Sequence, residues 1–369
     1  MPANDMEAHP THGDGRAHPP ERAASRHISR EDALPTGTVL RAISGIYDVQ
    51  PDDPQLPRLV RCTLRERLRK RLVFTQSKSL PRRVKEVRRL NVVEPVVAGD
   101  RVRFQLTPTS GTAVPAGVIE DVLPRQRELT RQAVTSGTVP IGQTIVANLD
   151  QVVLVFAAAS PDPIPGLIDR LLVSCESEEL PAILCINKCD LGISEAFAHD
   201  LEVYERAGYA VLRTSAVTGQ GLEQLRAVLQ GKTSAVVGPS GVGKSTLLNA
   251  LQPGLGLRVG EVSAATGKGV HTTRYAQLIP FGEGTFVADT PGLRQLGLWE
   301  VSPDDLDRYF PEFRPYLGTC RFGNCAHVDE IGCAIRAAVE RGAIDARRYR
   351  SYVKMFTEEA ARAGAYDTA

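Results

Sequence analysis

The chain has 369 residues, 42% of them hydrophobic, and its 44 lysines and arginines against 43 acidic residues give a formal net charge of +1. This length predicts two or three domains, and the hydrophobic content is that of a globular protein. No run approaches the roughly 18 uncharged apolar residues of a membrane-spanning helix, so we expect no membrane insertion.

Residues 1–34 are rich in Pro, Ala, His and charged residues, which bury too little apolar surface to fold and predict a disordered tail. They contain no apolar core, so we expect no signal peptide. Four of the seven histidines lie here, and a solvated tail is favoured over weak metal binding. Of the seven cysteines, three cluster near the C-terminus and four are scattered. This usage indicates reduced thiols and a cytoplasmic protein.

Short strands and no long helix are predicted next, which indicates a small barrel. The expected strands are a bent strand at 36–50, a second at 58–71, a turn and strand at 97–106, and a strand leading into a linker at 116–129. Between 58 and 90, thirteen basic residues face two acids, a local net charge of +11. A nucleic-acid backbone is the natural partner of this segment, and the alternative is a solvated charged face. Only Phe74 is aromatic there, so base stacking is not expected to dominate.

From the stretch NLDQVVLVFAAAS onward the pattern changes to apolar runs alternating with helical stretches, which predicts an α/β domain with a largely parallel sheet. The expected strands lie at 152–158, 182–186, 210–213, 234–237 and 285–288, and the expected helices at 164–178, 221–230 and 244–251. Beyond about residue 300 the chain is predicted to be mainly helical.

The stretch GPSGVGKST follows a predicted strand and opens a helix, which is the context of a phosphate-binding loop. Glycines let backbone N–H groups curl around phosphate oxygens, and the helix N-terminus favours the anion. Lys244 is expected to reach the β and γ phosphates and Ser245 to ligate Mg²⁺. The nucleotide-contacting residues predicted here are Gly238, Pro239, Ser240, Gly241, Val242, Gly243, Lys244, Ser245 and Thr246.

The stretch NKCD ends a predicted strand, and we expect Asn187, Lys188 and Asp190 to contact a guanine base. A carboxylate can accept two N–H bonds from guanine, whereas adenine offers no such pair. Alone, this signal fits a surface turn equally well. Ser215 and Ala216 end the next predicted strand, where a second base-contacting loop belongs. The base loop precedes the phosphate loop, the reverse of the usual order in GTPases.

Two segments resemble nucleotide switches. Asp289 in VADTPG is suited to hold Mg²⁺, and the N–H of Gly292 to sense a γ-phosphate. Thr272 or Thr273 is a candidate Mg²⁺ ligand, with Thr273 preferred, and the alternative is a loop hydroxyl bonded locally. Leu293 stands where Ras-like sites have a water-positioning Gln. His271 is therefore a candidate catalytic residue, beside Lys244 and Thr273.

Three cysteines and one histidine fall within a short C-terminal segment: Cys320, Cys325, His327 and Cys333. This set completes a tetrahedron and predicts a structural zinc site with no open position for water. The alternatives are reduced cysteines beside a surface histidine, or an iron–sulfur cluster.

Taken together, the permuted order, GPSGVGKSTLLN, HTTR, DTPGL, ANLDQVVLVFA and the Cys-x4-Cys-x-His-x5-Cys spacing resemble the circularly permuted RsgA GTPases, over about residues 35 to 360. The resemblance implies an OB barrel, a GTPase core and a zinc domain acting late in 30S maturation. It also implies that His271 orients water and that a hydrophobic residue replaces the Gln, as Leu293 does. The expected domains are a tail at 1–34, an OB-fold RNA-binding domain at 35–128 with an insertion at about 72–92, a GTPase domain at 143–299 and a zinc-binding helical domain at 300–369.

The predicted function is thus GTP hydrolysis, with Mg²⁺, by a monomeric assembly factor that binds the 30S subunit and its 16S rRNA. One alternative is a GTP-binding RNA scaffold with little hydrolysis, which Leu293 keeps open. A second is a P-loop ATPase or kinase, against which the base loop argues.

Overall fold

The computed structural model describes residues 34–66, 68, 95–108, 114–133, 141–255, 276–282, 284–289 and 301–366. Several predicted features lie outside the described residues: most of the basic segment and its insertion at 72–92, and His271, Thr272, Thr273, Gly292 and Leu293. The chain divides after Leu34 into two units, and the description concerns the second.

Five strands form a closed barrel, as predicted: β1 (Thr36–Ile43), β2 (Ile46–Pro51), β3 (Val60–Leu64), β4 (Arg101–Thr107) and β5 (Ala116–Val122). They follow the order β1-β2-β3-β5-β4, and pairing of β1 with β4 closes the barrel. Only β3 and β5 pair in parallel among these strands. Alternate residues point inward, so that Tyr47, Val49, Phe104 and Ile119 are fully buried.

The prediction of one bent strand over 36–50 was wrong, because β1 and β2 are two antiparallel strands joined by a tight turn. Ser44 and Gly45 both have positive φ, 51° and 78°. That is the geometry of a two-residue hairpin loop whose twist matches the flanking strands. The Ser-Gly dipeptide was the local signal for it. The strand predicted over 58–71 also ends earlier, at Leu64.

A separate two-stranded hairpin was not predicted. It comprises β6 (Glu128–Ala133) and β7 (Ile141–Ala147). The expected linker after 116–129 therefore begins as a strand. Leu129 and Val146 of this hairpin are buried and contribute to the core of the α/β domain.

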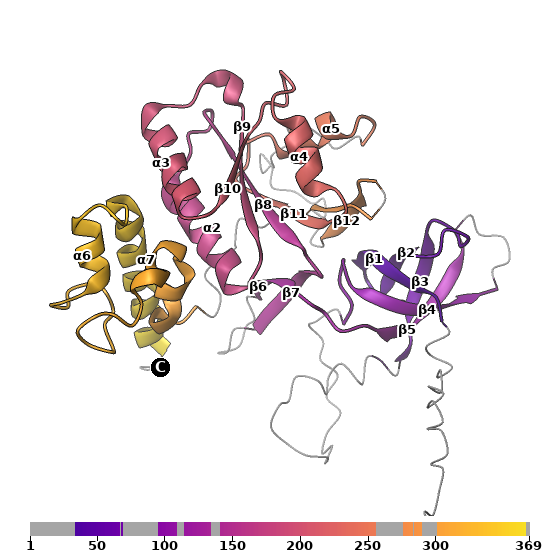
Figure 1. Cartoon of the computed structure of the whole chain (residues 1–369). Helices are drawn as coiled ribbons and strands as arrows, with labels where there is room; N and C mark the ends of the chain where they lie inside the picture. The colour runs from indigo at the N-terminus through magenta and orange to yellow at the C-terminus, as the bar shows by residue number, and fades with distance from the viewer. Residues whose placement is uncertain are drawn as a thin grey trace, which may run out of the picture. The chain divides into compact units, whose positions relative to one another are not determined.

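The α/β sheet has the order β10-β9-β8-β11-β13-β12, and Figure 1 shows its strands between helices α2 to α5. Its strands are β8 (Gln151–Ala157), β9 (Ala182–Asn187), β10 (Ala210–Arg213), β11 (Thr233–Val237), β12 (Gln277–Pro280) and β13 (Phe286–Asp289). All neighbours pair in parallel except β12 and β13. The parallel sheet predicted from the alternating pattern is thus confirmed, with β12 as an added antiparallel strand that also pairs with β1 of the barrel, at Gln277 and Arg41.

Helices cover both faces of this sheet: α2 (Pro165–Ser177), α3 (Glu195–Arg206), α4 (Leu222–Leu229) and α5 (Lys244–Leu251). Every residue of β8 is buried, as expected for a strand covered on both sides. Its even-numbered residues, such as Leu154, pack with residues of α2 and α3. Its odd-numbered residues, such as Val155, pack with residues of α4 and α5.

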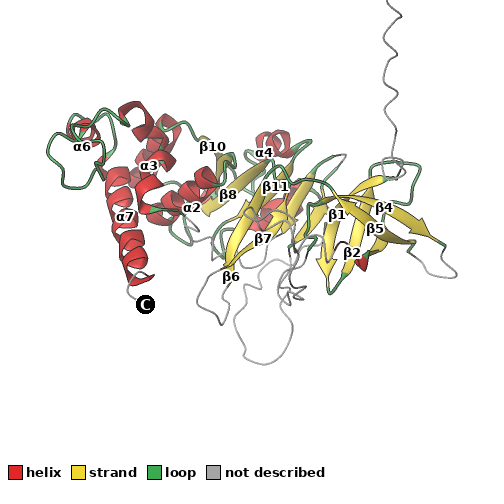
Figure 2. Cartoon of the chain, turned by 90° about the horizontal axis from the view of Figure 1, so that it is seen from below, coloured by secondary structure: helices red, strands yellow, loops and turns green. Residues whose placement is uncertain are grey.

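The C-terminal region is mainly helical, as predicted, and Figure 2 shows it as a group of red helices. It contains the 3₁₀ helices η3 (Pro303–Tyr309) and η4 (Pro311–Tyr316) and the helices α6 (Ala334–Glu340) and α7 (Ala346–Tyr366). In its core Phe310 stacks on Phe313, and Tyr352 meets both rings edge-on, with ring centroids 5.0 to 5.4 Å apart. Among the described helices none is long and apolar enough to cross a bilayer.

Candidate functional site

The phosphate loop lies where predicted, between β11 and α5. A Cβ on Gly238 would lie 1.9 Å from the carbonyl oxygen of Val155, and one on Gly243 would lie 2.6 Å from Nδ2 of Asn187. Only glycine therefore lets the loop pass this close to β8 and β9. Lys244 Nζ folds over the loop and donates to the carbonyl oxygens of Gly238, at 2.8 Å, and Pro239, at 2.7 Å.

The base loop begins at the end of β9, and Asn187 ties it to two other loops. Its Nδ2 donates to the carbonyl oxygen of Val242 in the phosphate loop, at 2.9 Å. Its Oδ1 accepts from the N–H of Ala216, at 3.3 Å, in the loop after β10. Asn187 is buried, so its side chain links the base loop, the phosphate loop and the loop after β10 from inside the domain and does not face solvent.

Lys188 and Asp190 follow Asn187 in the base loop. Lys188 has φ +61°, and its Nζ donates to the carbonyl oxygen of Ser160 in the loop after β8. Asp190 lies in the 3₁₀ turn η1 (Cys189–Leu191) and is exposed, and its Oδ1 accepts from the hydroxyl of the buried Ser215, at 2.5 Å. An exposed carboxylate fixed by one oxygen retains lone pairs to accept further N–H groups.

Asp289 is the last residue of β13, which pairs in parallel with β11. Since Ala235 of β11 lies opposite Ala288, the backbone of Asp289 reaches the same edge of the sheet as the phosphate loop. The carboxyl ends of parallel strands gather at one edge, where ligands bind in open α/β sheets.

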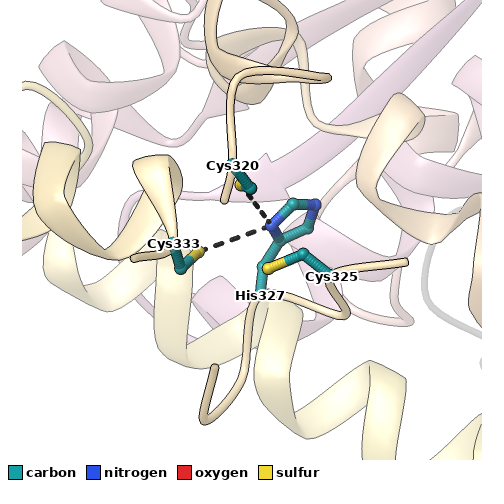
Figure 3. A group of neighbouring side chains, drawn as sticks. All are labelled: Cys320, Cys325, His327 and Cys333. Carbon is teal, nitrogen blue, oxygen red and sulfur yellow. Dashed lines mark hydrogen bonds between the residues drawn. The ribbon is translucent and has the colours of Figure 1, made fainter. Parts of the chain in front are cut away.

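The predicted Cys/His set is brought together in the C-terminal region, with its four ligand atoms all within 4.8 Å of one another (Figure 3). Nδ1 of His327 lies 3.5 Å from the Sγ atoms of both Cys320 and Cys333. Zinc–sulfur and zinc–nitrogen bonds at a tetrahedral angle would separate these atoms by about 3.6 Å. The four residues therefore fit a tetrahedral metal ion, with Nδ1 as the histidine's ligand atom.

Backbone N–H groups support the sulfurs. The N–H of Ala334 donates to Sγ of Cys320, at 3.3 Å, and that of Arg336 to Sγ of Cys333, at 3.4 Å. Burial opposes ionisation of Cys320, but the Ala334 N–H and neighbouring polar groups outweigh it and lower the pKa of this thiol. Burial and the adjacent sulfurs raise the pKa of Cys325 to about 12, because adjacent thiolates repel without a cation.

Side chains of helix α7 support the loop that carries Cys325 and His327. The hydroxyl of Tyr349 donates to the carbonyl oxygen of His327, at 2.8 Å, and that of Tyr352 to the carbonyl oxygen of Ala326, at 2.7 Å. Glu330 accepts from backbone N–H groups on the same loop, including that of Ala326. These contacts keep His327 in its left-handed backbone conformation, with φ +60°.

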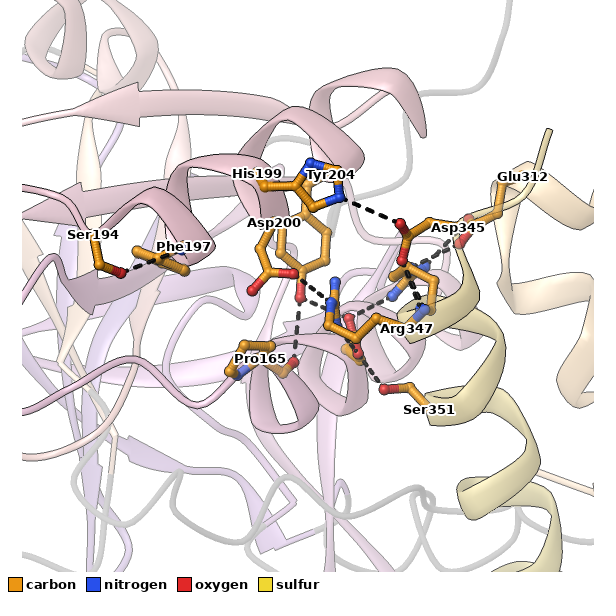
Figure 4. Close-up of polar contacts among 12 residues, drawn as sticks. Pro165, Ser194, Phe197, His199, Asp200, Tyr204, Glu312, Asp345, Arg347 and Ser351 are labelled. Atoms are coloured by element: carbon orange, nitrogen blue, oxygen red, sulfur yellow. Dashed lines mark hydrogen bonds and ion pairs between the residues drawn. The ribbon is translucent and has the colours of Figure 1, made fainter. Parts of the chain in front are cut away.

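A buried charge network joins α2 to α7, and Figure 4 shows its polar contacts. Asp169 of α2 is fully buried, and its two oxygens accept from the guanidinium groups of Arg347 and Arg348, each at 2.7 Å. Arg348 is also fully buried and donates to Glu312 of η4. The C-terminal region is thereby attached to the α/β domain by matched charges.

Some residues of the site had no local sequence signal. Ser160 lies in an irregular loop, and only its position after a parallel strand could have indicated that it borders the site. Asp307 contacts His327 at 3.1 Å from another segment, and spacing between the ligands gives no indication of it.

This sheet and its loops define a P-loop GTPase in which the base loop precedes the phosphate loop in the chain. The family model described as "RsgA GTPase" matches residues 122–299. The "Small ribosomal subunit biogenesis GTPase RsgA" of Moorella thermoacetica is 41% identical over 326 residues, which cover 88% of this chain and 98% of that protein. The protein of the same name from Gemmatimonas aurantiaca is 50% identical over 244 residues, covering 65% of this chain and 78% of that one. The chain belongs to the RsgA GTPase family.

Two solved structures agree with the fold. YjeQ from Thermotoga maritima superposes with a TM-score of 0.66 at 34% identity, covering 88% of this chain and 98% of its own. YloQ, described as a circularly permuted GTPase, gives a TM-score of 0.63 at 30% identity, covering 90% and 98%. The predictions of family, fold class and GTPase activity are thus confirmed.

Proposed function

We propose that the protein hydrolyses GTP as a late assembly factor of the small ribosomal subunit, and that binding to that subunit stimulates hydrolysis. The observation that carries the proposal is the junction made by Asn187, which joins the base loop, the phosphate loop and the loop after β10. The names of the relatives, which are small-subunit biogenesis GTPases, support the choice of partner.

Guanine specificity is assigned to Asp190. The hydroxyl of Ser215 holds one of its oxygens, and the carboxylate is left to accept the paired N–H donors of guanine. A P-loop ATPase or kinase would have no use for this arrangement, because adenine would leave the carboxylate desolvated and unpaired.

The reaction needs phosphate binding, a metal ion and an oriented water. We assign phosphate binding to the loop at 238–246 with Lys244, whose Nζ would exchange its bonds to loop carbonyls for phosphate oxygens. When bound, Mg²⁺ supplies charge stabilisation at the transferring phosphate, and Ser245, Thr273 or Thr272, and Asp289 would hold it. His271 is proposed to orient the attacking water, because Leu293 offers no hydrogen bond, and Gly292 to sense the γ-phosphate.

The metal-binding group is proposed to hold one structural zinc ion, since four protein ligands leave no position for water. Contact with 16S rRNA is assigned to the barrel and to this C-terminal domain. Phe322 and Ile331 are exposed on the ligand loops, and the guanidinium of Arg321 lies 5.4 Å from the Phe322 ring centroid. An exposed aromatic ring beside a guanidinium suits stacking on unpaired bases.

Ion pairs neutralise much of the positive charge on the described barrel strands. Arg41 and Arg61 both pair with Asp48, and Arg65 pairs with Glu120. The charge of the described barrel strands is therefore largely balanced, and the excess positive charge proposed to meet rRNA belongs mostly to residues 67–90. The domain limits given above, a monomeric state and a cytoplasmic location are proposed with this function.

GTP hydrolysis titrated with 30S, 50S and 70S particles tests the proposal, with ATP as the control substrate. Stimulation by 30S particles alone is the expected outcome. Tight GTP binding without single-turnover hydrolysis, even with saturating 30S, would favour the scaffold alternative. Equal ATP turnover would overturn the guanine assignment.

A further inference from the structure

Among the described residues, Asp307 is the only one whose side chain forms a polar contact with Nε2 of His327. It lies on η3, and its Oδ2 is 3.1 Å from Nε2 of His327, while Nδ1 of the same ring faces two sulfurs. Both partners are shielded, since the side chain of His327 is 5% exposed and that of Asp307 is 19% exposed. This is unlike the neighbouring pair of Asp305 and Arg308, whose side chains are 43% and 70% exposed.

The geometry determines where the imidazole proton belongs. A metal bound at Nδ1 requires that nitrogen to be unprotonated, so the ring's remaining proton lies on Nε2 and is donated to Asp307. A carboxylate accepting from the distal nitrogen of a ligand histidine fixes its tautomer and ring orientation and raises its basicity. Each of these effects strengthens the bond between Nδ1 and a metal ion.

The second carboxylate oxygen of Asp307, Oδ1, is in an unfavourable environment, and the contact between Oδ2 and His327 must offset this. Oδ1 is buried and has no hydrogen-bond partner among the described residues. A buried unpaired carboxylate oxygen is unfavourable. An aspartate used only to stabilise η3 would gain more by turning this oxygen to solvent or to a backbone N–H. Holding Oδ2 against Nε2 accounts for the observed orientation.

We propose that Asp307 is a positioning residue for the metal centre, which holds His327 as an Nδ1 ligand and slows loss of the metal. The proposal rests on the metal site proposed above and extends that site to η3, outside the segment that carries the four ligands. Asp307 touches no metal itself and acts only through the imidazole.

The test uses the full chain loaded with Zn²⁺ and compares Asp307→Asn with the wild type. Asn preserves the shape of Asp but removes its charge, so the fold of η3 should survive. Asp305→Asn is the matched control, because it lies on the same 3₁₀ helix and removes an exposed charge. We expect zinc transfer to a chromogenic chelator to become about 10-fold to 100-fold faster in Asp307→Asn, and to be unchanged in the control.

A second readout separates positioning from general loosening of the loop. NMR of histidine-labelled, zinc-loaded protein should show His327 with a protonated Nε2 whose proton resonance is shifted downfield by the carboxylate. That shift should be lost in Asp307→Asn although zinc is still bound. Unchanged zinc release and an unchanged His327 resonance would overturn the role of Asp307 while leaving the metal site standing. A wild-type protein that retains no stoichiometric zinc would overturn both.

Discussion

Removing the charge of Asp169 should destabilise the attachment of the C-terminal region to the α/β domain. This carboxylate accepts four hydrogen bonds, from Arg347, Arg348, Tyr204 and Ser351. Two of the donors are charged, and a hydrogen bond to a charged group contributes about 1.5–3 kcal/mol. Arg348 is fully buried and, among the described residues, would retain Glu312 as its only ion-pair partner. Breaking a buried ion pair from one side costs about 3–5 kcal/mol, so Asp169→Asn should cost a similar amount.

Urea unfolding followed by circular dichroism measures this cost, and hydrogen exchange in α7 locates it. Glu202→Gln is the control, because Glu202 and Arg206 form a pair with both side chains 62% exposed. Such a pair contributes about 0–1 kcal/mol. If Asp169→Asn shifts the unfolding midpoint no more than the control, the network contributes no net stability and the reasoning fails. Faster exchange in α3 but not in α7 would also contradict it.

Four further predictions concern the nucleotide site and the metal. Asp190→Asn should weaken GTP and GDP binding by about 1.5–3 kcal/mol or more, and unchanged GDP affinity would remove its role as base reader. Ser215→Ala should weaken both nucleotides by about 1 kcal/mol, measured by calorimetry, with no effect on zinc content. His271→Ala should abolish most of the 30S-stimulated single-turnover rate but spare GTP affinity, and full stimulation would show it to be an ordinary loop residue. Cys325→Ser should release zinc and weaken 30S association while intrinsic hydrolysis persists, and full 30S binding without metal would rule this out.

The features that could be predicted from the sequence are those encoded by neighbouring residues. The phosphate loop has a contiguous pattern, because its glycines and Lys244 lie together in one turn between β11 and α5. The buried strand β8 is a continuous apolar run because both its faces are covered. The three cysteines and the histidine that could hold a metal ion lie within one short segment, so their spacing alone indicated a candidate metal site.

The features that could not be predicted depend on contacts between distant segments. The hairpin of β6 and β7 is two-stranded, and its buried residues Leu129 and Val146 pack into the core of the α/β domain, so its own pattern is weak. The bond between Lys188 and Ser160 joins two loops that meet only because β8 and β9 are neighbours. Asp307 approaches His327 through the packing of η3, and an aspartate in an acidic 3₁₀ helix has no pattern that marks it.

The permuted order follows from what a parallel sheet requires. Strand neighbours, not chain order, bring the base loop of β9 and the phosphate loop of β11 together, with β8 between them. Joining or cutting the chain elsewhere leaves these hydrogen bonds unchanged. In a GTPase with the usual chain order, in which the phosphate loop precedes the base loop, the strand that ends in Asp289 would lead on to β8. Here β8 is entered from the β7 hairpin, and the next described element after Asp289 in the chain is η3, where Asp307 contacts His327 of the candidate metal site. Permutation thus preserves the arrangement of the nucleotide loops and gives the strand that carries Asp289, a proposed Mg²⁺ ligand, a covalent connection to the C-terminal domain.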